Sequence, residues 1–518
     1  MFEDNRREKL LTLGTMCFAL FMAMLDNTVV NVALPKIQAH LGSGVSGLQW
    51  VVDAYTLLFA SLLLTGGTLG DLYGRKRMFQ AGLLIFSLGS LLCGLAPSIG
   101  FLIASRALQG IGAAALIPST LSIITVTFPD PRERAQAIGM WAGVSGLALA
   151  LGPVVGGLLV DSLGWQSVFF LNVPIGILAF FVAARFVSES KNPEGRTIDL
   201  AGQILGITWL AALVYALIEG NARGWRSPII LTMFAIAAVG LVAFLFVERR
   251  SKSPMLRLDF FRVPTFTAGV TVAALVSFGM FGMLFFLSLF MQNVQDYSAL
   301  GAGLRFLPAT VAIIITAPLA GRLAGRIGSR WPMTIGMAMN GAAMLMYLSV
   351  HAGTPYSSWW WIQVIQGVGM GLTMAPMTAA VMGAVPPARA GMASATTNTS
   401  REVGGTFGIA LLGAILTSRF KSVLASALAA QGVPAALRER IAFAVSHGQT
   451  GGAGALPAGV DAGALKSVFA NAFVDGMHLA MVVAAAALLF GSLVAFTFVR
   501  PARTQGVPAI VQPEAVPA

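Results

Sequence analysis

Residues 67–77 read Gly67-Thr68-Leu69-Gly70-Asp71-Leu72-Tyr73-Gly74-Arg75-Lys76-Arg77 and lie between two long apolar runs. Gly70 and Gly74 permit close backbone approach and a positive φ angle, so the stretch predicts a tight turn. Its three consecutive cations are typical of a short loop on the cytoplasmic face of a membrane. Asp71 lies at the lipid boundary, where a carboxylate needs a partner: Arg75, Arg77 or the positive end of another helix. A basic loop that only sets topology explains these residues as well as a specific functional motif does.

The composition excludes a soluble globular protein. Hydrophobic residues make up 56% of the 518 residues, charged residues make up 10%, and the mean hydropathy is +0.79. The net charge of +12 comes from bases in short loops between apolar runs, so we expect no nucleic-acid partner. Cys17 and Cys93 lie inside apolar runs and predict no disulfide framework. The four histidines are scattered, and no nucleophile–base motif appears, so we expect neither a metal site nor an enzyme.

Hydropathy predicts an all-α membrane protein with fourteen transmembrane helices, each near the roughly 20 residues that span a bilayer. The predicted spans are 11–34, 48–70, 78–96, 101–126, 135–160, 166–187, 199–219, 228–247, 264–291, 300–320, 332–350, 358–383, 391–418 and 474–499. Residues 1–190 would form one six-helix half and residues 263–503 a second, with two linker helices in residues 191–262. We expect a long outside loop at 420–473 and a disordered tail at 504–518.

The basic residues predict the orientation of these spans. An even number of spans puts both termini on one side. The loops of that side hold 22 of the 33 lysines and arginines, against 8 in the loops of the other side. Because basic loops stay in the cytoplasm, we expect cytoplasmic termini and a place in the inner (plasma) membrane.

An internal repeat supports the two halves. Three motifs recur in order, 254 to 258 residues apart: Gly67-x-Leu69-x-Asp71-x-x-Gly74 as Gly321-x-Leu323-x-Gly325-x-x-Gly328, Gln109-Gly110-x-Gly112 as Gln366-Gly367-x-Gly369, and Pro118 as Pro376. Parallel repeats of this kind build alternating-access transporters with a central site. In the second copy Gly325 replaces Asp71 and Gln363 replaces Arg106, so the ionisable chemistry is concentrated in the first half.

Two opposite charges lie at similar depths within predicted spans. Asp26 is eight residues, or about 12 Å, from the outer end of the first span, and Arg106 is about 8 Å deep in the fourth. An acid and a base at matched depth can pair, which offsets their desolvation. A pair open to competition by a proton or a substrate would be a coupling device. The alternative is a fixed structural ion pair.

Other polar and aromatic residues are candidates for a substrate pocket. Asp53 is near the outer end of its span, where either solvation at the interface or a function explains it. One residue of the Arg401-Glu402 pair would face the central cavity. The aromatic residues Phe278, Phe281 and Phe285 share one helix face, for which lipid-facing packing is the favoured interpretation and a pliable pocket wall the alternative. The full set of candidates is Asn31, Asp53, Gln109, Phe281, Phe285, Gln363, Arg401 and Glu402.

The fifth span carries two rows of small residues. Gly139 and Gly143 are four residues apart, and Gly152-Pro153-x-x-Gly156-Gly157 follows. Small residues at this spacing let helices approach closely, and the proline bends the helix.

With these residues the chain resembles the fourteen-span drug:proton antiporters of the major facilitator superfamily (EmrB/QacA type). The resemblance covers nearly all of residues 10–500 and rests on five motifs: Leu25-Asp26-x-Thr28-Val29-Val30-Asn31-Val32-Ala33-Leu34-Pro35, Gly67 to Arg77, Arg106-x-x-Gln109-Gly110, Gly152-Pro153-x-x-Gly156-Gly157, and Trp165 to Gly176.

The resemblance implies a role for each motif. Arg106 would be the proton-linked arginine, and Asp26 the carboxylate that proton and substrate share. The loop containing Asp71 would contact the helix that begins near Arg389 to Ala393 in one conformation and release it in another. The motif in the fifth span, with Gly143 upstream of it, would set the direction of export. Few acids other than Glu402 lie in membrane spans of the second half, which speaks against polyvalent cationic substrates.

The sequence therefore predicts proton-driven export of hydrophobic or amphipathic small molecules, with the proton gradient as energy source and no cofactor. The partners expected are a lipophilic substrate, protons and the lipid bilayer, with a periplasmic adaptor as well in a double-membrane bacterium. A dedicated exporter of a single metabolite or antibiotic and a proton-coupled importer are the alternatives, together with a membrane sensor.

Overall fold

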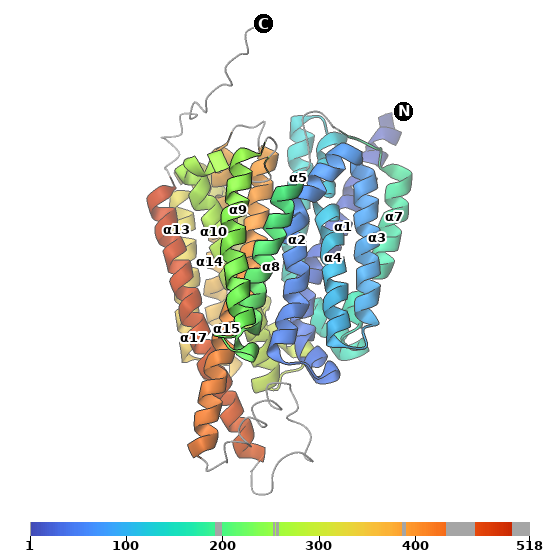
Figure 1. Ribbon diagram of the computed structural model, residues 1–518. Coiled ribbons are helices and arrows are strands. Elements are labelled where there is room, and N and C mark those ends of the chain that lie inside the picture. The colour runs from blue at the N-terminus through green and yellow to red at the C-terminus, as the bar shows by residue number, and fades with distance from the viewer. Residues whose placement is uncertain are drawn as a thin grey trace.

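The computed structural model describes residues 2–191, 199–251, 254, 258–385, 390–430 and 462–499. Every regular element in these ranges is helical (Figure 1). The all-α prediction is therefore confirmed for this part of the chain.

The helices form two sequential groups and a pair between them. The N-terminal group comprises α1 (Phe2–Leu41), α2 (Val45–Tyr73), α3 (Arg75–Gly94), α4 (Ile99–Thr127), α5 (Pro131–Leu163), α6 (Ser167–Phe170) and α7 (Asn172–Phe186). The pair is α8 (Leu200–Arg223) and α9 (Pro228–Arg250). The C-terminal group comprises α10 (Pro264–Leu289), α11 (Ala299–Arg305), α12 (Leu307–Ile327), α13 (Arg330–Met346), α14 (Trp360–Gly383), α15 (Ala390–Ala430) and α17 (Ala462–Phe498), with single turns at Leu258–Arg262, Phe290–Val294, Tyr347–Ser349 and Tyr356–Ser358.

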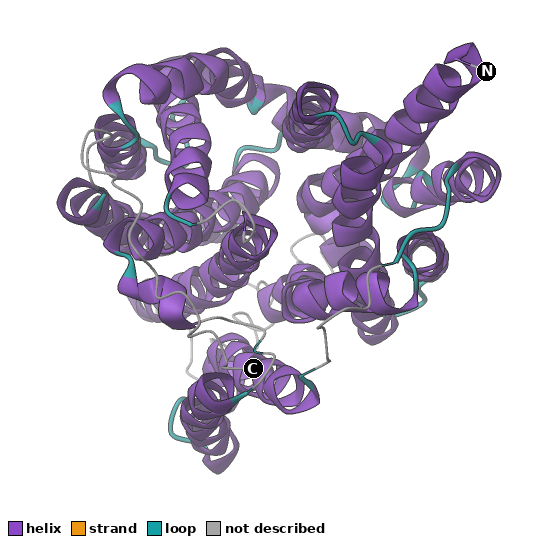
Figure 2. Ribbon diagram, turned by 90° about the horizontal axis from the view of Figure 1, so that it is seen from above, coloured by secondary structure: helices purple, strands orange, loops and turns teal. Residues whose placement is uncertain are grey.

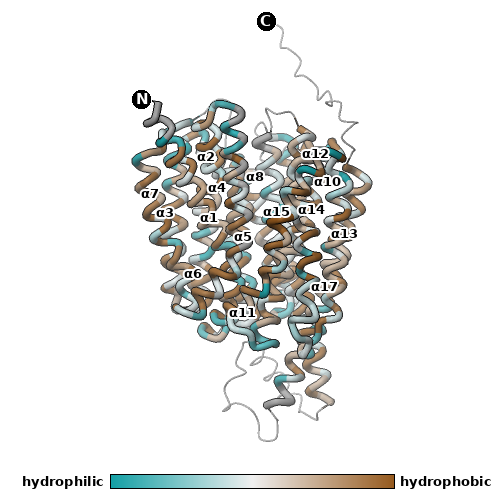
Figure 3. The backbone as a smooth tube through the Cα atoms, turned by 180° about the vertical axis from the view of Figure 1, so that it is seen from behind, coloured by the Kyte–Doolittle hydropathy of each residue, from teal (hydrophilic) through white to brown (hydrophobic). Residues whose placement is uncertain are grey.

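Twelve helices within the described residues are long and apolar enough to cross a membrane. The two predicted spans outside this set are α5, which contributes only the short apolar stretch Leu151–Leu163, and α13, which is 17 residues long. Figure 3 shows hydrophilic residues mainly at the turns at both ends of the bundle and hydrophobic residues along the helices. A multi-span membrane protein follows, whereas the number fourteen stays a prediction.

The two groups lie side by side, and α8 and α9 stand beside the contact between them (Figures 1 and 2). The helix α1 begins, and α17 finishes, at the upper end of the bundle in Figure 1, which we call the near end. The opposite end, from which α15 and α17 project, is the far end. Within the segment 420–473, predicted as an outside loop, residues 420–430 continue α15 and residues 462–473 belong to α17. Most of that loop and the predicted tail at 504–518 lie outside the described residues.

One apolar core contains side chains from both groups. It includes Leu34 of α1, Phe169 of α6, and Phe281 and Phe285 of α10. The favoured lipid-facing interpretation of the α10 aromatics is wrong, because Phe278, Phe281 and Phe285 are all buried inside the protein. Apolar side chains exposed at the surface are instead frequent on α9 and α7, among them Val239, Val242 and Phe181.

Candidate functional site

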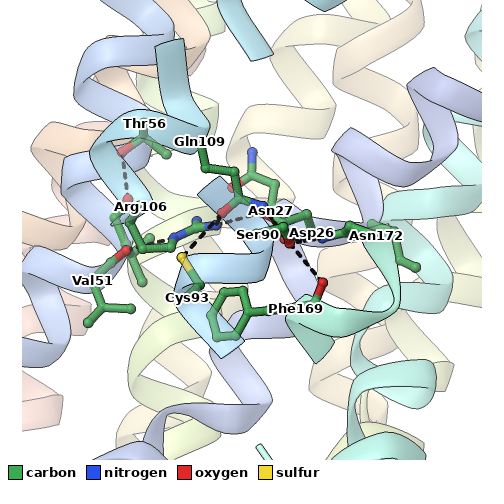
Figure 4. Close-up of polar contacts among 12 residues, drawn as sticks. Asp26, Asn27, Val51, Thr56, Ser90, Cys93, Arg106, Gln109, Phe169 and Asn172 are labelled. Atoms are coloured by element: carbon green, nitrogen blue, oxygen red, sulfur yellow. Dashed lines mark hydrogen bonds and ion pairs between the residues drawn. The ribbon is translucent and has the colours of Figure 1, made fainter. Parts of the chain in front are cut away.

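A buried ion pair joins the middle of α1 to α4 (Figure 4). Asp26 Oδ2 lies 2.6 Å from Arg106 Nη1, and both side chains are 0% exposed. The other carboxylate oxygen accepts hydrogen bonds from Gln109 Nε2 at 2.9 Å and from Asn172 Nδ2 at 2.7 Å. The pairing expected from their similar depths is therefore present, and the acid has donors from α4 and α7.

The guanidinium of Arg106 is held by backbone, amide and aromatic groups. Its Nε donates to the Val51 carbonyl oxygen at 3.0 Å, and Nη1 also donates to Gln109 Oε1 at 2.6 Å. The Tyr55 ring lies 4.3 Å from the guanidinium carbon, a distance at which cation–π attraction contributes. Arg106 Nη2 is buried and has no hydrogen-bond partner in the structure. The Nη2 group of the cation thus remains unused.

A second layer of polar groups orients the first. Ser90 Oγ accepts from Asn172 Nδ2 at 2.9 Å and from Gln109 Nε2 at 3.3 Å, and it donates to the Phe169 carbonyl oxygen at 2.8 Å. The residues Asn172 and Ser90 were not predicted as site residues. Asn172 does lie in the quoted stretch Trp165 to Gly176, as a polar residue at the start of an apolar helix, but a neutral side chain carries little signal by itself.

This arrangement can bind and release a proton or an opposite charge. Three donors contact the Asp26 carboxylate: the Arg106 guanidinium and the amides of Gln109 and Asn172. Because the ion pair is buried, removal of either partner is costly, at about 3–5 kcal/mol. Protonation of Asp26 would remove the counter-charge of Arg106 inside the protein. The pair is therefore suited to link proton binding to a change of packing.

The glycine-proline motif of α5 contacts both groups. An added Cβ at Gly156 would lie 2.6 Å from Val29 Cγ2 of α1, and one at Gly152 would overlap the Thr28 side chain. On the other side, an added Cβ at Gly157 would lie 2.5 Å from the Leu300 Cα atom of α11. The close approach expected for this motif is present at these three glycines.

Pro153 and Gly143, also on α5, differ in how closely they pack against other helices. The Pro153 carbonyl oxygen is the atom against which Gly303 of α11 packs. By contrast, the expectation of close packing is wrong for Gly143, which would have nothing within 4 Å of an added Cβ.

The stretch at 67–77 forms the turn between α2 and α3. Gly74 has φ +116°, and an added Cβ there would lie 2.7 Å from the Glu189 carboxyl carbon. Gly70, in contrast, is an ordinary helical residue, and Gly67 would place a Cβ at van der Waals distance from Pro118. The expectation of a special glycine is thus met only at Gly74.

The charged residues of this turn form two separate ion pairs. Asp71 Oδ1 lies 2.7 Å from Arg75 Nη2, so the first predicted partner is correct. Arg77 instead lies 3.8 Å from Glu189, whose carboxylate also accepts from the backbone N–H groups of Lys76 and Arg77. The predicted contact of Asp71 with the helix start near Arg389 to Ala393 falls largely outside the described residues, because 386–389 are not described.

Most other pocket candidates are buried apart from the ion pair. Asn31 donates to carbonyl oxygens of its own helix, and its backbone oxygen accepts from Ser288 of α10 at 2.8 Å. Gln363 is buried, and neither its amide oxygen nor its nitrogen has a partner. Arg401 and Glu402 are half-buried on α15. Of the candidates, the structure brings only Gln109 into direct contact with Asp26 and Arg106.

Asp53 differs from its predicted surroundings. Solvation at the membrane interface is wrong, because the side chain is 0% exposed. Both carboxylate oxygens are buried without a hydrogen-bond partner.

Hydrogen bonds join the two groups across the far half of the bundle. They comprise Gln49 Nε2 to the Ile409 oxygen (2.9 Å), Ser288 Oγ to the Asn31 oxygen (2.8 Å), Gln292 Nε2 to the Val32 oxygen (3.0 Å), Asn293 Nδ2 to Gln38 Oε1 (3.2 Å), Leu300 N to Asp161 Oδ2 (2.8 Å) and Thr406 Oγ1 to Thr56 Oγ1 (3.0 Å). Asp161 thereby caps the start of α11 with a carboxylate of α5. The far ends of the two groups are closed against each other.

Arg305 packs between aromatic rings. Its guanidinium carbon lies 3.5 Å from the Tyr297 ring centroid and 5.2 Å from that of Tyr356. Burial raises the pKa of the Tyr356 phenol to about 12, so the phenol stays protonated and donates to the Arg305 carbonyl oxygen at 2.8 Å. Among the residues that the structure describes, no group of three or more His, Cys, Asp or Glu side chains could hold a metal ion.

Comparison with known proteins identifies the family of this chain. Its sequence is 42% identical over 424 residues to the multidrug resistance protein Stp of Mycobacterium tuberculosis, covering 81% of this chain and 78% of the relative. It is 34% identical over 490 residues to the tetracenomycin C resistance and export protein of Streptomyces glaucescens, covering 93% and 90%. It is also 38% identical over 405 residues to a methylenomycin A resistance protein of Bacillus subtilis, covering 77% and 86%.

The fold agrees with this assignment. The crystal structure of a bacterial homologue of the human lysosomal transporter Spinster, in an inward-facing and unoccupied conformation, superposes with a TM-score of 0.64 at 19% identity, over 95% of this chain and 98% of that one. The sequence description of the Major Facilitator Superfamily matches residues 16–409. The chain therefore belongs to the Major Facilitator Superfamily.

Proposed function

We propose that this protein exports hydrophobic or amphipathic small molecules, antibiotics among them, in exchange for protons. The observation that carries the proposal is the buried Asp26–Arg106 pair, at 2.6 Å, in a chain whose relatives are named multidrug and antibiotic resistance proteins. Transport, with the proton gradient as energy source and without a cofactor, is the whole activity in this proposal. Within the membrane, an ionisable residue is functional by default.

Asp26 is the proposed proton site and Arg106 its counter-charge. In the unprotonated state the carboxylate holds Arg106, Gln109 and Asn172 together at distances of 2.6 to 2.9 Å. A proton on Asp26 weakens all three contacts, which frees α1, α4 and α7 to repack. A substrate that binds when Asp26 is unprotonated then competes with the proton through packing rather than by direct contact.

Alternating access requires that the two groups separate at one end while they close at the other. The hydrogen bonds between the groups at the far end support a state that is closed there, as do the contacts of Gly157 and Pro153 with α11. The loop containing Asp71 at the near end is the proposed opposing gate. The glycine-proline motif of α5 would then control the far-end closure.

The finer architecture belongs to the same proposal. Counting α5 and α13 as spans gives fourteen, arranged as two six-helix halves with α8 and α9 as linkers. The basic loops favour a cytoplasmic near end, so that the far end faces outward. The protein would lie in the cell membrane with both termini inside, and a periplasmic adaptor would be a partner only in a double-membrane bacterium.

Drug-induced proton release from acidified inverted vesicles tests the function. We expect lipophilic drugs to collapse the pH gradient with the wild type and to leave it intact with Asp26→Asn. Asp475→Asn serves as the control, because Asp475 is an exposed acid that pairs with Arg419 at the surface. Equal gradient collapse with the wild type and Asp26→Asn would refute proton exchange through Asp26.

A dedicated exporter of one compound is the second candidate. It is favoured by relatives that are named for a single antibiotic, tetracenomycin C in one case and methylenomycin A in another. Response to several unrelated lipophilic compounds in the vesicle assay supports the multidrug function. Response to one compound alone supports the dedicated exporter.

A further inference from the structure

The contact between α2 and α15 contains a carboxylate that the ion-pair site does not use. Gln49 and Thr56, seven residues apart on α2, both bond across this contact: Gln49 Nε2 to the Ile409 oxygen at 2.9 Å, and Thr56 Oγ1 to Thr406 Oγ1 at 3.0 Å. Asp53 is four residues after Gln49 and three before Thr56, so it lies on the same face of α2. The acid is therefore enclosed where the two groups meet.

Apolar side chains also border Asp53. Trp50 lies three residues before Asp53 on α2, and Leu57 lies four residues after it. Both side chains pack with Leu217 of α8 and Ala410 of α15 in one apolar cluster. Asp53 is 0% exposed, and neither carboxylate oxygen has a hydrogen-bond partner. Among the described residues, the polar group nearest the carboxylate is the neutral Thr56 hydroxyl, which cannot balance a buried negative charge as a cation would.

The charged groups on neighbouring helices are engaged or point elsewhere. On α8, Glu219 accepts from Trp50 Nε1 at 3.1 Å and lies 3.5 Å from Arg223. On α4 and α1, Arg106 and Asp26 pair with each other.

On the described part of α15, the charged residues nearest to Thr406 along the chain are Arg401 and Glu402. Arg401 and Glu402 lie about one turn before Thr406, and no ion pair that the structure records joins either of them to Asp53. Among the residues that the structure describes, no ion pair joins Asp53 to a cation.

An ionised carboxylate in such a place is far less stable than a protonated one, so the closed far end requires a neutral Asp53. We propose that Asp53 is a second proton-binding site, which takes a proton from the far side before α2 and α15 close and returns it to that side when they part. The proton enters and leaves on one side, so the proton stoichiometry of transport is unchanged. Asp53 would set the pH dependence of the far gate, whereas Asp26 would drive exchange.

The proposal rests on the proposed function only in requiring that the far end open and close. Because the closed state binds one proton more than the open state, low pH favours closure. The ratio of closed to open molecules then changes by up to about tenfold per pH unit while Asp53 titrates.

Pulsed electron paramagnetic resonance between two spin labels measures this ratio without any drug. Suitable label sites at the far end are Leu95→Cys after α3 and Ser357→Cys before α14, both exposed and in different groups. Cys17 is replaced by serine, and the buried Cys93 stays in place. Asp26→Asn in all samples removes the titration of the ion-pair site.

Three variants in lipid nanodiscs decide the outcome. With Asp53 intact, we expect the short far-end distance to gain population as the pH falls. With Asp53→Asn, a neutral side chain of the same shape, the short distance should dominate at every pH, and Asp53→Glu should restore the pH dependence. The proposal would be overturned if the protein with Asp53 intact and the Asp53→Asn variant gave the same pH curve. It would also be overturned if neither protein showed any pH dependence.

The two proposals fail separately. Loss of drug-induced proton release in Asp26→Asn tests the exporter, while the distance measurement reports on Asp53 whether or not any drug is transported.

Discussion

Gly157→Ala should hold the far end open. Gly157 lies on α5 where this helix meets α11, and an added Cβ would lie 2.5 Å from Leu300 Cα and 2.6 Å from the Ala299 carbonyl oxygen. Both are backbone atoms, so no side-chain rotation relieves the overlap. Ordinary contact begins at 3.4 Å, and the two helices must therefore separate by about 0.9 Å.

The cost of that separation applies to the closed far end alone. Overpacking of a tight contact costs about 1–3 kcal/mol, which changes the ratio of closed to open molecules by roughly 5- to 150-fold. Alanine also favours helix formation over glycine by about 1 kcal/mol, so the stability of α5 itself should not fall. Gly157→Ala should therefore shift molecules towards the open far end without lowering the overall stability of the protein.

Gly143→Ala is the matched control, because an added Cβ on the same helix would have nothing within 4 Å. Spin labels at Leu95→Cys and Ser357→Cys should show a shift to the long far-end distance with Gly157→Ala and the wild-type distribution with Gly143→Ala. Drug efflux should fall in parallel. Equal behaviour of the two alanine variants would refute the reasoning that α5 closes the far end through this contact.

Three further changes test the site and the turn. Asn172→Ala removes a 2.7 Å donor to Asp26, worth about 1.5–3 kcal/mol for a charged acceptor, and should reduce drug-induced proton release roughly 10- to 150-fold; unchanged release would exclude Asn172 from the site. Gly74→Ala imposes φ +116° on an L-residue and pushes on Glu189, so thermal unfolding in detergent should show a loss of about 1–3 kcal/mol, which an unshifted midpoint would contradict. Asp475→Asn breaks an exposed ion pair and should change stability by less than about 1 kcal/mol, a result that a larger loss in the same assay would contradict.

The ion pair could be predicted from sequence because charge is conspicuous within an apolar run. A carboxylate at Asp26 and a guanidinium at Arg106 each carry a large desolvation cost, and similar depth leaves few partners. Neutral donors carry no comparable cost, so Ser90 and Asn172 became visible only when α3 and α7 were placed next to α1. The residues that orient a buried charge are thus harder to find than the charge itself.

The aromatic face of α10 shows a second limit. Lipid and protein interior are both apolar, so a run such as Phe278, Phe281 and Phe285 satisfies either environment equally well. Only tertiary packing, with Gly405 beside Phe281 and Phe407 beside Phe278, shows that this face points inward. For soluble proteins the hydrophobic period identifies the core, whereas for this chain it identifies only helices.

Asp26 and Asp53 show why burial alone does not define the role of an intramembrane acid. Both are 0% exposed. Asp26 has a cation at 2.6 Å and two amide donors. Asp53 has no ion-pair partner among the described residues, and a buried charge without one is costly. In the two proposals each acid is linked to a different motion: Asp26 to the packing within the N-terminal group, and Asp53 to the contact between the groups. A transporter that must respond both to its substrate and to the pH outside gains from keeping these two protons on separate carboxylates.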